Sequence, residues 1–366
     1  MYFLFGLIII GVIYDITAAT KEPDPNGYIF FCLCMGRFGN QAEHFIGGLG
    51  FAKRLNRTLV VPPWRTDKNV DFDQWFDVEY LQRYHRVILA KDFMKNLAPK
   101  IWPKGKRYGF CFKMPNQPYC KVKDGSPFVD FWDELGVDFD KDISYEFSYA
   151  LIDQWDKDLN GQRYPVLALR GAPAGYPMME ADLEVQNFMV YSKFVKKEAE
   201  SLLELYLDEV SYDYIGVHLR SGSDWTRACS HILGEQPVNK FMASYQCQGW
   251  DYSKPLTQSM CMPSQKEIVD RIKDVIYNTQ IKKVLIASDE PNYHIVSQIE
   301  TDLPGVIVVR PSPHLPVVDT YLLAQSRFFI GNCVSSFSGF VWRQRQAHNL
   351  GPSAHFGVPL IVHSEL

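Results

Sequence analysis

The sequence predicts an α/β protein with two Rossmann-like domains that face a cleft. In the second half of the chain, short apolar runs alternate with amphipathic stretches, which is typical of a parallel sheet covered by helices. The chain also opens with a strand, a glycine-flanked turn, a helix and a second strand, which indicates a similar unit at its start. Its 366 residues suffice for two domains with separate cores. We expect these domains at 20–207 and 208–362.

The first domain is best defined at its two ends. Its predicted elements, in chain order, are a strand at 28–34, a turn at 35–39, a helix at 40–55, a strand at 58–61 and a charged amphipathic helix at 191–207. The first helix buries Phe45, Leu49, Ala52 and Leu55 at helical spacing. Residues 64–175 are rich in Pro, Asp and aromatic residues and have no clear period, so few elements are predicted there.

The second domain alternates more regularly. The predicted strands are 214–219, 284–287, 306–309 and 328–330, and the predicted helices are 264–277, 292–299, 317–326 and 336–346. Ser264 followed by Glu267 is a capping box that supports the first of these helices. The loop at 221–263 holds three cysteines and has no period, so we expect disulfides to fix it.

The two ends of the chain indicate the lumen of the endoplasmic reticulum. Residues 3–13 are almost wholly apolar, and small residues follow up to Ala19, which predicts a signal peptide at 1–19. The apolar run is shorter than a membrane helix needs, so no membrane span is expected. The tail 363–366, His-Ser-Glu-Leu, is close to known retention signals. We expect a soluble lumenal protein.

Composition and cysteines agree with that compartment. The chain is 46% hydrophobic with a net charge of −4, which fits a folded protein and gives no support for a nucleic-acid surface. Its eight cysteines favour four disulfides. Spacing suggests only that Cys111 and Cys120 close a local loop, and it leaves Cys32 and Cys34 open as a redox or metal site. Asn56 begins a sequon for N-glycosylation.

Arg220 is the first candidate site residue. An apolar run at 214–217 leads to His218, Leu219 and Arg220, and a turn of small polar residues with Asp224 follows. Ligands of open α/β sheets bind beyond the carboxyl ends of the strands, and a guanidinium suits diphosphate oxygens. A salt bridge to Asp224 explains Arg220 equally well. His218 can act as a base or ligand, although a hydrogen-bonded histidine at the edge of the core is the commoner outcome.

Two further loops lead from a strand into a helix. In the first, glycines flank Arg37 and Phe38 before Asn40, and the start of the helix attracts anions. Asn40 also fits an N-cap, with Glu43 reaching back to it. In the second loop, at 331–337, backbone amides and the hydroxyls of Ser335 and Ser336 can hold phosphates, or the serines can simply cap the helix.

Several carboxylates have the positions or spacing of ligand contacts or metal ligands. Asp289 and Asp319 can recognise a base or ribose, although a structural hydrogen bond is the simpler role for each. Asp-x-Asp triplets occur at 71–73, 138–140 and 156–158, and such carboxylates can hold a divalent ion. None follows a clear strand, so we interpret them as solvated turns. Arg220 is then expected to do what a metal would otherwise do.

The three segments together resemble the protein O-fucosyltransferase 1 family, which modifies EGF-like repeats. The matching segments are 36–41 with 56–58 and 61–64, then 218–220 with 222–225, and then 331–337. The resemblance implies a two-domain GT-B fold. It also implies an inverting, metal-independent transfer of fucose from GDP-β-L-fucose to Ser or Thr of folded EGF-like repeats, as in Notch-type receptors. No cofactor is implied, and we expect a monomer.

The resemblance also implies roles for individual residues. Arg220 would bind the diphosphate and assist its departure, and Asn40 would lie near the acceptor hydroxyl. Asp224 and Asp289 would be supporting residues. The donor site would be lined by Arg37, Phe38, Gly39, Asn40, His218, Leu219, Arg220, Asp319, Ser336 and Phe337. The implied disulfides are Cys32–Cys34, Cys111–Cys120, Cys229–Cys261 and Cys247–Cys333.

Two other functions remain open from the sequence. One is a lumenal binding protein or chaperone that holds EGF-like repeats without chemistry. The other is a thiol oxidoreductase, which depends only on the pair Cys32 and Cys34.

Overall fold

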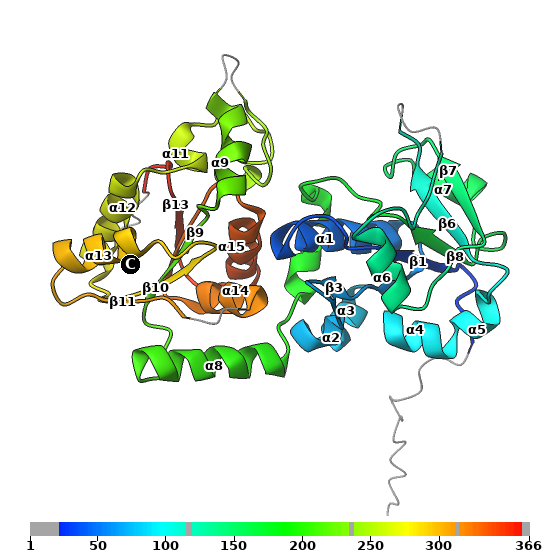
Figure 1. Ribbon diagram of the computed structural model, residues 1–366, viewed down its shortest axis with the longest axis horizontal. Coiled ribbons are helices and arrows are strands. Elements are labelled where there is room, and N and C mark those ends of the chain that lie inside the picture. Colours follow the sequence, from blue (N-terminus) through cyan, green and yellow to red (C-terminus); the bar gives the residue numbers. More distant parts are fainter. Residues whose placement is uncertain (1–21, 115–118, 234–237, 312–314, 361–366) are drawn as a thin grey trace, which may run out of the picture.

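The computed structural model describes residues 22–114, 119–233, 238–311 and 315–360. The predicted signal peptide at 1–19 and the tail at 363–366 lie outside these ranges. Figure 1 shows two lobes, each with a sheet between helices, and α1 (Phe38–Arg54) and α15 (Ser336–His348) lie side by side where the lobes meet. None of the helices in the described ranges is long and apolar enough to cross a bilayer.

The first lobe contains a six-stranded parallel sheet with the order β5-β2-β1-β8-β6-β7. Its strands are β1 (Tyr28–Phe31), β2 (Thr58–Val61), β5 (Val87–Leu89), β6 (Tyr108–Phe112), β7 (Lys141–Tyr145) and β8 (Val166–Leu169). A short antiparallel ribbon joins β3 (Trp64–Arg65) and β4 (Asn69–Val70). The other helices are α2 (Phe72–Trp75), α3 (Val78–Tyr84), α4 (Ala90–Asn96), α5 (Ala98–Ile101), α6 (Phe128–Glu134), α7 (Ile152–Asp158), η1 (Glu180–Phe188) and α8 (Lys193–Leu207).

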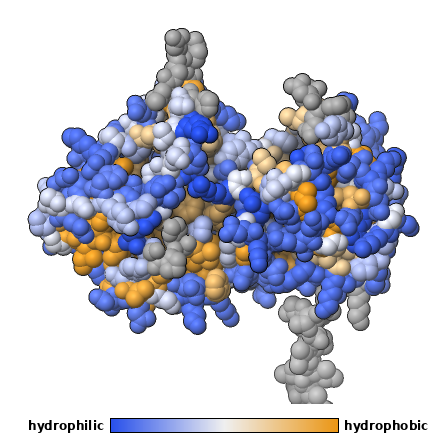
Figure 2. All heavy atoms as spheres, in the orientation of Figure 1, coloured by the Kyte–Doolittle hydropathy of each residue, from blue (hydrophilic) through white to orange (hydrophobic). Residues whose placement is uncertain are grey.

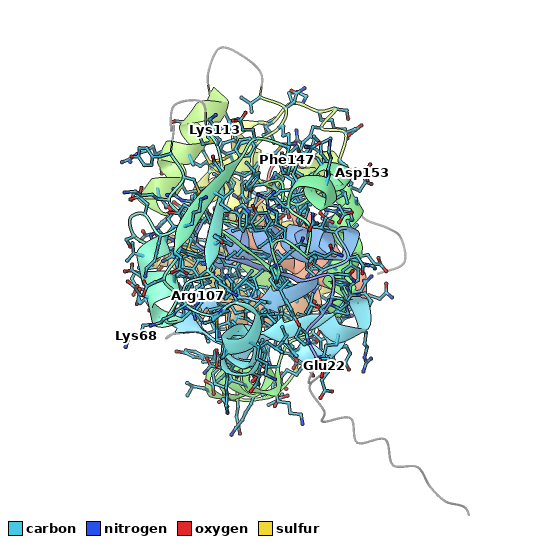
Figure 3. The ribbon with its side chains drawn as sticks, turned by 90° about the vertical axis from the view of Figure 1, so that its right-hand side faces the viewer. Glu22, Lys68, Arg107, Lys113, Phe147 and Asp153 are labelled. Atoms are coloured by element: carbon cyan, nitrogen blue, oxygen red, sulfur yellow. A yellow bond between two sulfur atoms is a disulfide. The ribbon has the colours of Figure 1, made fainter. Side chains whose placement is uncertain are left out.

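Alternating side chains of β1 pack into two different cores. Ile29 and Phe31 pack with α1 on one face, whereas Tyr28 and Phe30 pack with α4, α5 and α6 on the other. Strand β8 is central and wholly buried, yet the sequence pattern did not predict it. Figure 3 views this lobe from its end, with Lys113 and Phe147, which follow β6 and β7, near one edge and Glu22, which precedes β1, near the other.

The second lobe contains a five-stranded parallel sheet with the order β11-β10-β9-β12-β13. Its strands are β9 (Ile215–Leu219), β10 (Lys283–Ser288), β11 (Ile307–Val309), β12 (Phe328–Gly331) and β13 (Ser353–His355). The helices are α9 (Ser223–Cys229), η2 (Ser230–Leu233), α10 (Tyr245–Gln248), α11 (Gln258–Cys261), α12 (Gln265–Thr279), α13 (Tyr293–Asp302), α14 (Pro316–Gln325) and α15. The alternating pattern predicted here is confirmed, but the edge strand β13 and the short helices α9, η2, α10 and α11 in the loop at 221–263 were not predicted.

One predicted helix cap is present and one is not. At the start of α12, Ser264 Oγ accepts the Glu267 amide at 3.3 Å and Glu267 accepts the Ser264 amide at 2.7 Å, so the capping box is confirmed. The cap predicted at Asn40 is wrong, because α1 already begins at Phe38 and its N-cap is Arg37. Glu43 does not return to the start of the helix but is buried against the second lobe.

All eight cysteines are paired. The bonds are Cys32–Cys34, Cys111–Cys120, Cys229–Cys261 and Cys247–Cys333. This pairing is the one implied by the family resemblance. The last two bonds link three cysteines of the irregular loop at 221–263 to each other and to Cys333, which follows β12.

The two lobes share one hydrophobic core. Phe340 of α15 packs edge-on against Phe38 of α1 at a centroid distance of 5.3 Å and against Phe76 at 5.9 Å. Tyr191 packs in the same way against Tyr321 of α14 at 5.1 Å. Helix α8, predicted to close the first domain, also packs on α14 of the second lobe. The relative position of the two sheets is therefore set by packed side chains.

Candidate functional site

A cavity of about 570 Å³ lies between the lobes, at the carboxyl ends of β1, β9, β10 and β12. The volume is in the range of small-ligand sites. On the face shown in Figure 2, the surface is hollowed between the two lobes. The cavity brings together eleven predicted residues, which are Arg37, Phe38, Gly39, Asn40, His218, Arg220, Asp224, Asp289, Asp319, Ser336 and Phe337. Leu219 does not line it, because its side chain points from β9 into the opposite core.

Arg220 follows β9 and forms ion pairs with two carboxylates. Its guanidinium bonds Asp224 at 2.6 Å and pairs with Asp289, and it lies over the Trp225 ring at 5.2 Å. Asp289 follows the neighbouring strand β10 and also accepts the amides of Ser221 and Gly222, at 2.9 and 3.0 Å. The turn and the guanidinium are thus held by the same carboxylate. The salt bridge and the ligand role are therefore compatible, because the acids orient a cation that still lines the cavity.

Asp224 connects the two sides of the cavity. Its carboxylate lies 3.6 Å from the Arg37 guanidinium, which belongs to the first lobe and is 73% exposed. The pKa of Asp224 is lowered, first by the hydrogen bond from Arg220 and also by the charges of Arg220 and Arg37. Asp224 is therefore ionised, and two guanidinium groups lie within reach of one anionic ligand.

Asn40 lies in the first turn of α1 and is held from both lobes. Its carboxamide oxygen accepts the hydroxyl of Tyr176 at 2.8 Å and the hydroxyl of Ser336, the first residue of α15, at 2.7 Å. Burial raises the pKa of Tyr176 to about 12, so this phenol keeps its proton. Because the oxygen is occupied, the amide nitrogen is the group left to contact a substrate.

The helices α1 and α15 begin face to face at the cavity. A Cβ atom on Gly39 would lie 2.6 Å from the Phe337 amide nitrogen and 2.7 Å from Ser336 Oγ. Only glycine lets the two first turns approach this closely. Helix starts carry unpaired amides and a partial positive charge, so two of them at one cavity favour an anionic group.

His218 is a buried neutral group. Burial, with the charge of Arg220 nearby, lowers its pKa to about 3. Its Nδ1 atom lies 2.7 Å from the Ser338 hydroxyl, and its ring stacks on Phe337 at a centroid distance of 4.5 Å. His218 therefore adds no charge to the cavity, and its contacts match the hydrogen-bonded histidine considered from the sequence.

Asp319 is a buried carboxyl in the first turn of α14. Burial raises its pKa to about 8, although the charge of Arg310 opposes the rise. A carboxyl in such a position can accept hydrogen bonds from a planar base in its ionised form. Perturbed acids in a cleft are candidates for function.

Other residues of the site had weak or misleading signals in the sequence. Trp225 and Met242 line the cavity, and Met242 belongs to the loop that has no period. Tyr176 contacts Asn40 from the segment after β8, where few elements were predicted. These residues become part of the site through contacts between segments that are distant in the sequence. The spacing of residues along the chain does not reveal such contacts.

The remaining candidates lie away from this cavity. Asp71 and Asp73 pair with Lys91 on the surface, at 3.1 and 2.9 Å, and Asp140 accepts the amides of Gly105 and Arg107, at 2.9 and 2.8 Å. These acids thus have local structural partners. Among the described residues, no group of three His, Cys, Asp or Glu is placed to hold a metal. Asn56 is exposed, as a glycosylation site requires.

Known proteins are similar to this chain in both sequence and fold. Residues 28–348 match the family model for GDP-fucose protein O-fucosyltransferase. The chain is 33% identical over 367 residues to GDP-fucose protein O-fucosyltransferase 1 of Caenorhabditis elegans, covering 93% of this chain and 92% of that protein. It is similar to a crystal structure of POFUT1 in complex with GDP-fucose, with a TM-score of 0.86, 33% identity and coverage of 93% and 100%. For an apo form of POFUT1, the TM-score is 0.84 at 34% identity, with coverage of 92% and 99%.

Proposed function

The chain belongs to the GDP-fucose protein O-fucosyltransferase family, and on that basis we propose the details of its reaction. It is a glycosyltransferase whose two parallel sheets match the GT-B architecture of the POFUT1 structures. The proposed reaction moves fucose from GDP-β-L-fucose to a Ser or Thr hydroxyl of a folded EGF-like repeat, with inversion and without a metal. The observation that carries the proposal is Arg220, oriented by two carboxylates toward the cavity.

The proposed step breaks the bond between fucose C1 and the diphosphate oxygen. The electron pair of that bond stays on the diphosphate, where the charge of Arg220 stabilises it. The acceptor oxygen bonds to C1 from the opposite face, which inverts the configuration, and then loses its proton to solvent water. We propose that the amide nitrogen of Asn40, whose oxygen is held by Tyr176 and Ser336, orients the acceptor hydroxyl. Asp224 and Asp289 are occupied by Arg220, so departure of the leaving group, more than base catalysis, is expected to drive the step.

The proposed setting is the lumen of the endoplasmic reticulum, which suits the proposed acceptor. Folded EGF-like repeats of secreted or membrane receptors of the Notch type acquire their disulfides in the endoplasmic reticulum, and the enzyme is proposed to act there as a monomer. The four disulfides of the chain support an oxidising compartment.

A transfer assay tests the proposed function. Purified protein given GDP-fucose and a folded EGF-like repeat should add the mass of one deoxyhexose to the repeat. The same repeat with reduced, alkylated cysteines should gain no mass, because the acceptor is proposed to be a folded surface. An unchanged mass with the folded repeat, in conditions where a known enzyme of this family is active, would refute the proposal.

The pKa of Asp319 leads to a pH dependence of donor binding. We propose that the ionised carboxylate accepts hydrogen bonds from the guanine base. Because the free carboxyl has a pKa of about 8, binding below that pH must release a proton. The dissociation constant of GDP should therefore fall as pH rises from 6 to 8, by up to about tenfold per unit, and level off above 8.

Calorimetry of GDP binding to wild type and Asp319→Asn measures this effect. The variant should bind more weakly and show a flatter pH profile. Titration of the GDP phosphates is common to both proteins, so it cancels in the comparison. Profiles of equal slope would show that Asp319 does not titrate on binding.

A further inference from the structure

A fully buried ion pair joins the two lobes behind the cavity. Glu43 of α1 and Arg343 of α15 lie 2.7 Å apart, and both side chains are 0% exposed. Burial raises the pKa of the Glu43 carboxyl, whereas the charge of Arg343 opposes that rise. Guanidinium groups keep their proton in proteins, and the charge of Arg343 favours the ionised form of Glu43.

The pair is surrounded by further hydrogen bonds, two of which cross the boundary between the lobes, those of Tyr245 with Glu43 and of Arg343 with Gln186. Glu43 also accepts the backbone amide of Met178 at 3.0 Å and the hydroxyl of Tyr245 at 3.2 Å. Arg343 donates through Nε to the side chain of Gln186 at 2.8 Å. The two charges therefore collect partners from segments of both lobes at a single point.

This point lies close to the groups that line the cavity. On α1, Glu43 is one helical turn beyond Asn40, and on α15, Arg343 is two turns beyond Ser336. Neither Glu43 nor Arg343 lines the cavity itself. The hydrogen bond from Ser336 to Asn40 thus joins the first turns of α15 and α1 at the cavity. The pair of Glu43 and Arg343 joins the same two helices further from the cavity.

The apolar contacts around the pair do not require these charges for cohesion. Replacing a buried ion pair by apolar groups is often neutral or stabilising, so its presence is weak evidence for stability. Phenylalanine rings, however, tolerate small sliding movements between helices, whereas an ion pair with fixed hydrogen bonds does not. Reacting groups need placement within a fraction of an ångström.

We propose that Glu43 and Arg343 are positioning residues that fix the register of α1 against α15 and so hold Asn40 and Ser336 in place across the cavity. The kcat measurements that test this proposal use the transfer reaction, so they rest on the proposed function. Substrate binding by the second lobe alone does not need the pair, whereas the chemical step does.

The test compares Glu43→Gln, Arg343→Met and the double variant with wild type. Each single variant leaves one buried charge or donor unpaired, so the melting temperature should fall and kcat should drop by roughly 10- to 100-fold. The double variant should recover most of the melting temperature. Its kcat should stay low, because no ion pair then fixes the register of α1 against α15. The dissociation constant of GDP should rise far less than kcat falls in all three, because Arg220 and Asp319 of the second lobe stay in place.

A matched control is the ion pair at the other end of α1. Arg54 pairs with the buried carboxylate of Asp182, and both belong to the first lobe. Arg54→Met should lower the melting temperature with kcat unchanged. Glu43→Asp, which keeps the charge but shortens the side chain, offers a milder change if the other variants fail to fold. Glu43→Asp should change the melting temperature only slightly and still lower kcat.

Hydrogen exchange gives a readout that does not depend on transfer. Amides at 41–42 and 339–342, which are the first hydrogen-bonded amides of α1 and α15, should exchange faster in the Glu43 and Arg343 variants but not in Arg54→Met. If wild type shows no transfer, this measurement still decides the positioning role, so the two proposals fail separately. The role is refuted if kcat of the folded variants equals wild type, if kcat recovers with the melting temperature in the double variant, or if exchange at these amides is unchanged.

Discussion

Replacing Arg220 with alanine should reduce fucosyl transfer by at least about 10³-fold while the protein still folds. The guanidinium is the charge placed to stabilise the departing diphosphate, and no other side chain can take its position at the end of β9. Its loss also leaves Asp289 without a cation and Asp224 with only Arg37, at 3.6 Å, so their negative charge would repel the diphosphate. Turnover should fall far more than stability, because Asp289 still holds the turn through two backbone amides.

Two comparison variants define this effect. Arg220→Lys keeps the charge but not the planar fork of donors, so its activity should lie between wild type and alanine. Arg327→Ala removes an exposed arginine whose partner is Asp213, at 2.8 Å, and it should behave as wild type. Turnover and melting temperature are measured for all three. An alanine variant that keeps more than about one hundredth of wild-type turnover is incompatible with the assigned role of Arg220.

Replacing Gly39 with alanine should disrupt the site from the opposite side. The added Cβ would meet the backbone nitrogen of Phe337 at 2.6 Å, and backbone cannot rotate away as a side chain can. The first turns of α1 and α15 must therefore move apart. That movement breaks the bond between Asn40 and Ser336 and displaces both helix starts from the substrate. We expect a loss of transfer of roughly 100-fold or more and a lower melting temperature.

Gly171→Ala is the matched control. Gly171 lies just after β8, its conformation suits any residue, and a Cβ there meets nothing within 4 Å. Transfer by this variant should equal wild type. If Gly39→Ala retains turnover like that of Gly171→Ala, the close approach of the two helices is not needed for catalysis.

The sequence predicted the second lobe better than the first for a physical reason. From Gln265 to His348, strands and helices alternate at short range, and these elements carry periodic signals of their own. In the first lobe, β6, β7 and β8 are short and separated by irregular segments. Strand β8, with only four residues, gains its place from pairing with β1 and β6, and such long-range pairing leaves no local pattern.

The site was predictable where chemistry follows the end of a strand. Arg220 and Asp289 end adjacent parallel strands, so the sheet itself brings them together. Asn40 was placed in the site, but its partner Glu43 was misinterpreted, because a capping box and a buried pair can share the same spacing. What separates them is the identity of the opposing residue, Arg343, which is 300 positions away.

The shared core of the two lobes has a consequence for synthesis of the chain. The first lobe emerges from the ribosome with all six strands of its sheet. At that stage the rings of Phe38, Phe76 and Tyr191 lack the contacts with α14 and α15 that bury them in the folded protein. Until Phe340 has been made, the nascent protein presents an aromatic surface that is buried in the finished enzyme. Exposed apolar surface of this kind attracts chaperones and promotes aggregation. The sheet of the first lobe can therefore be complete while its aromatic side chains are still exposed. They become buried only when α15 has been made and packs against them.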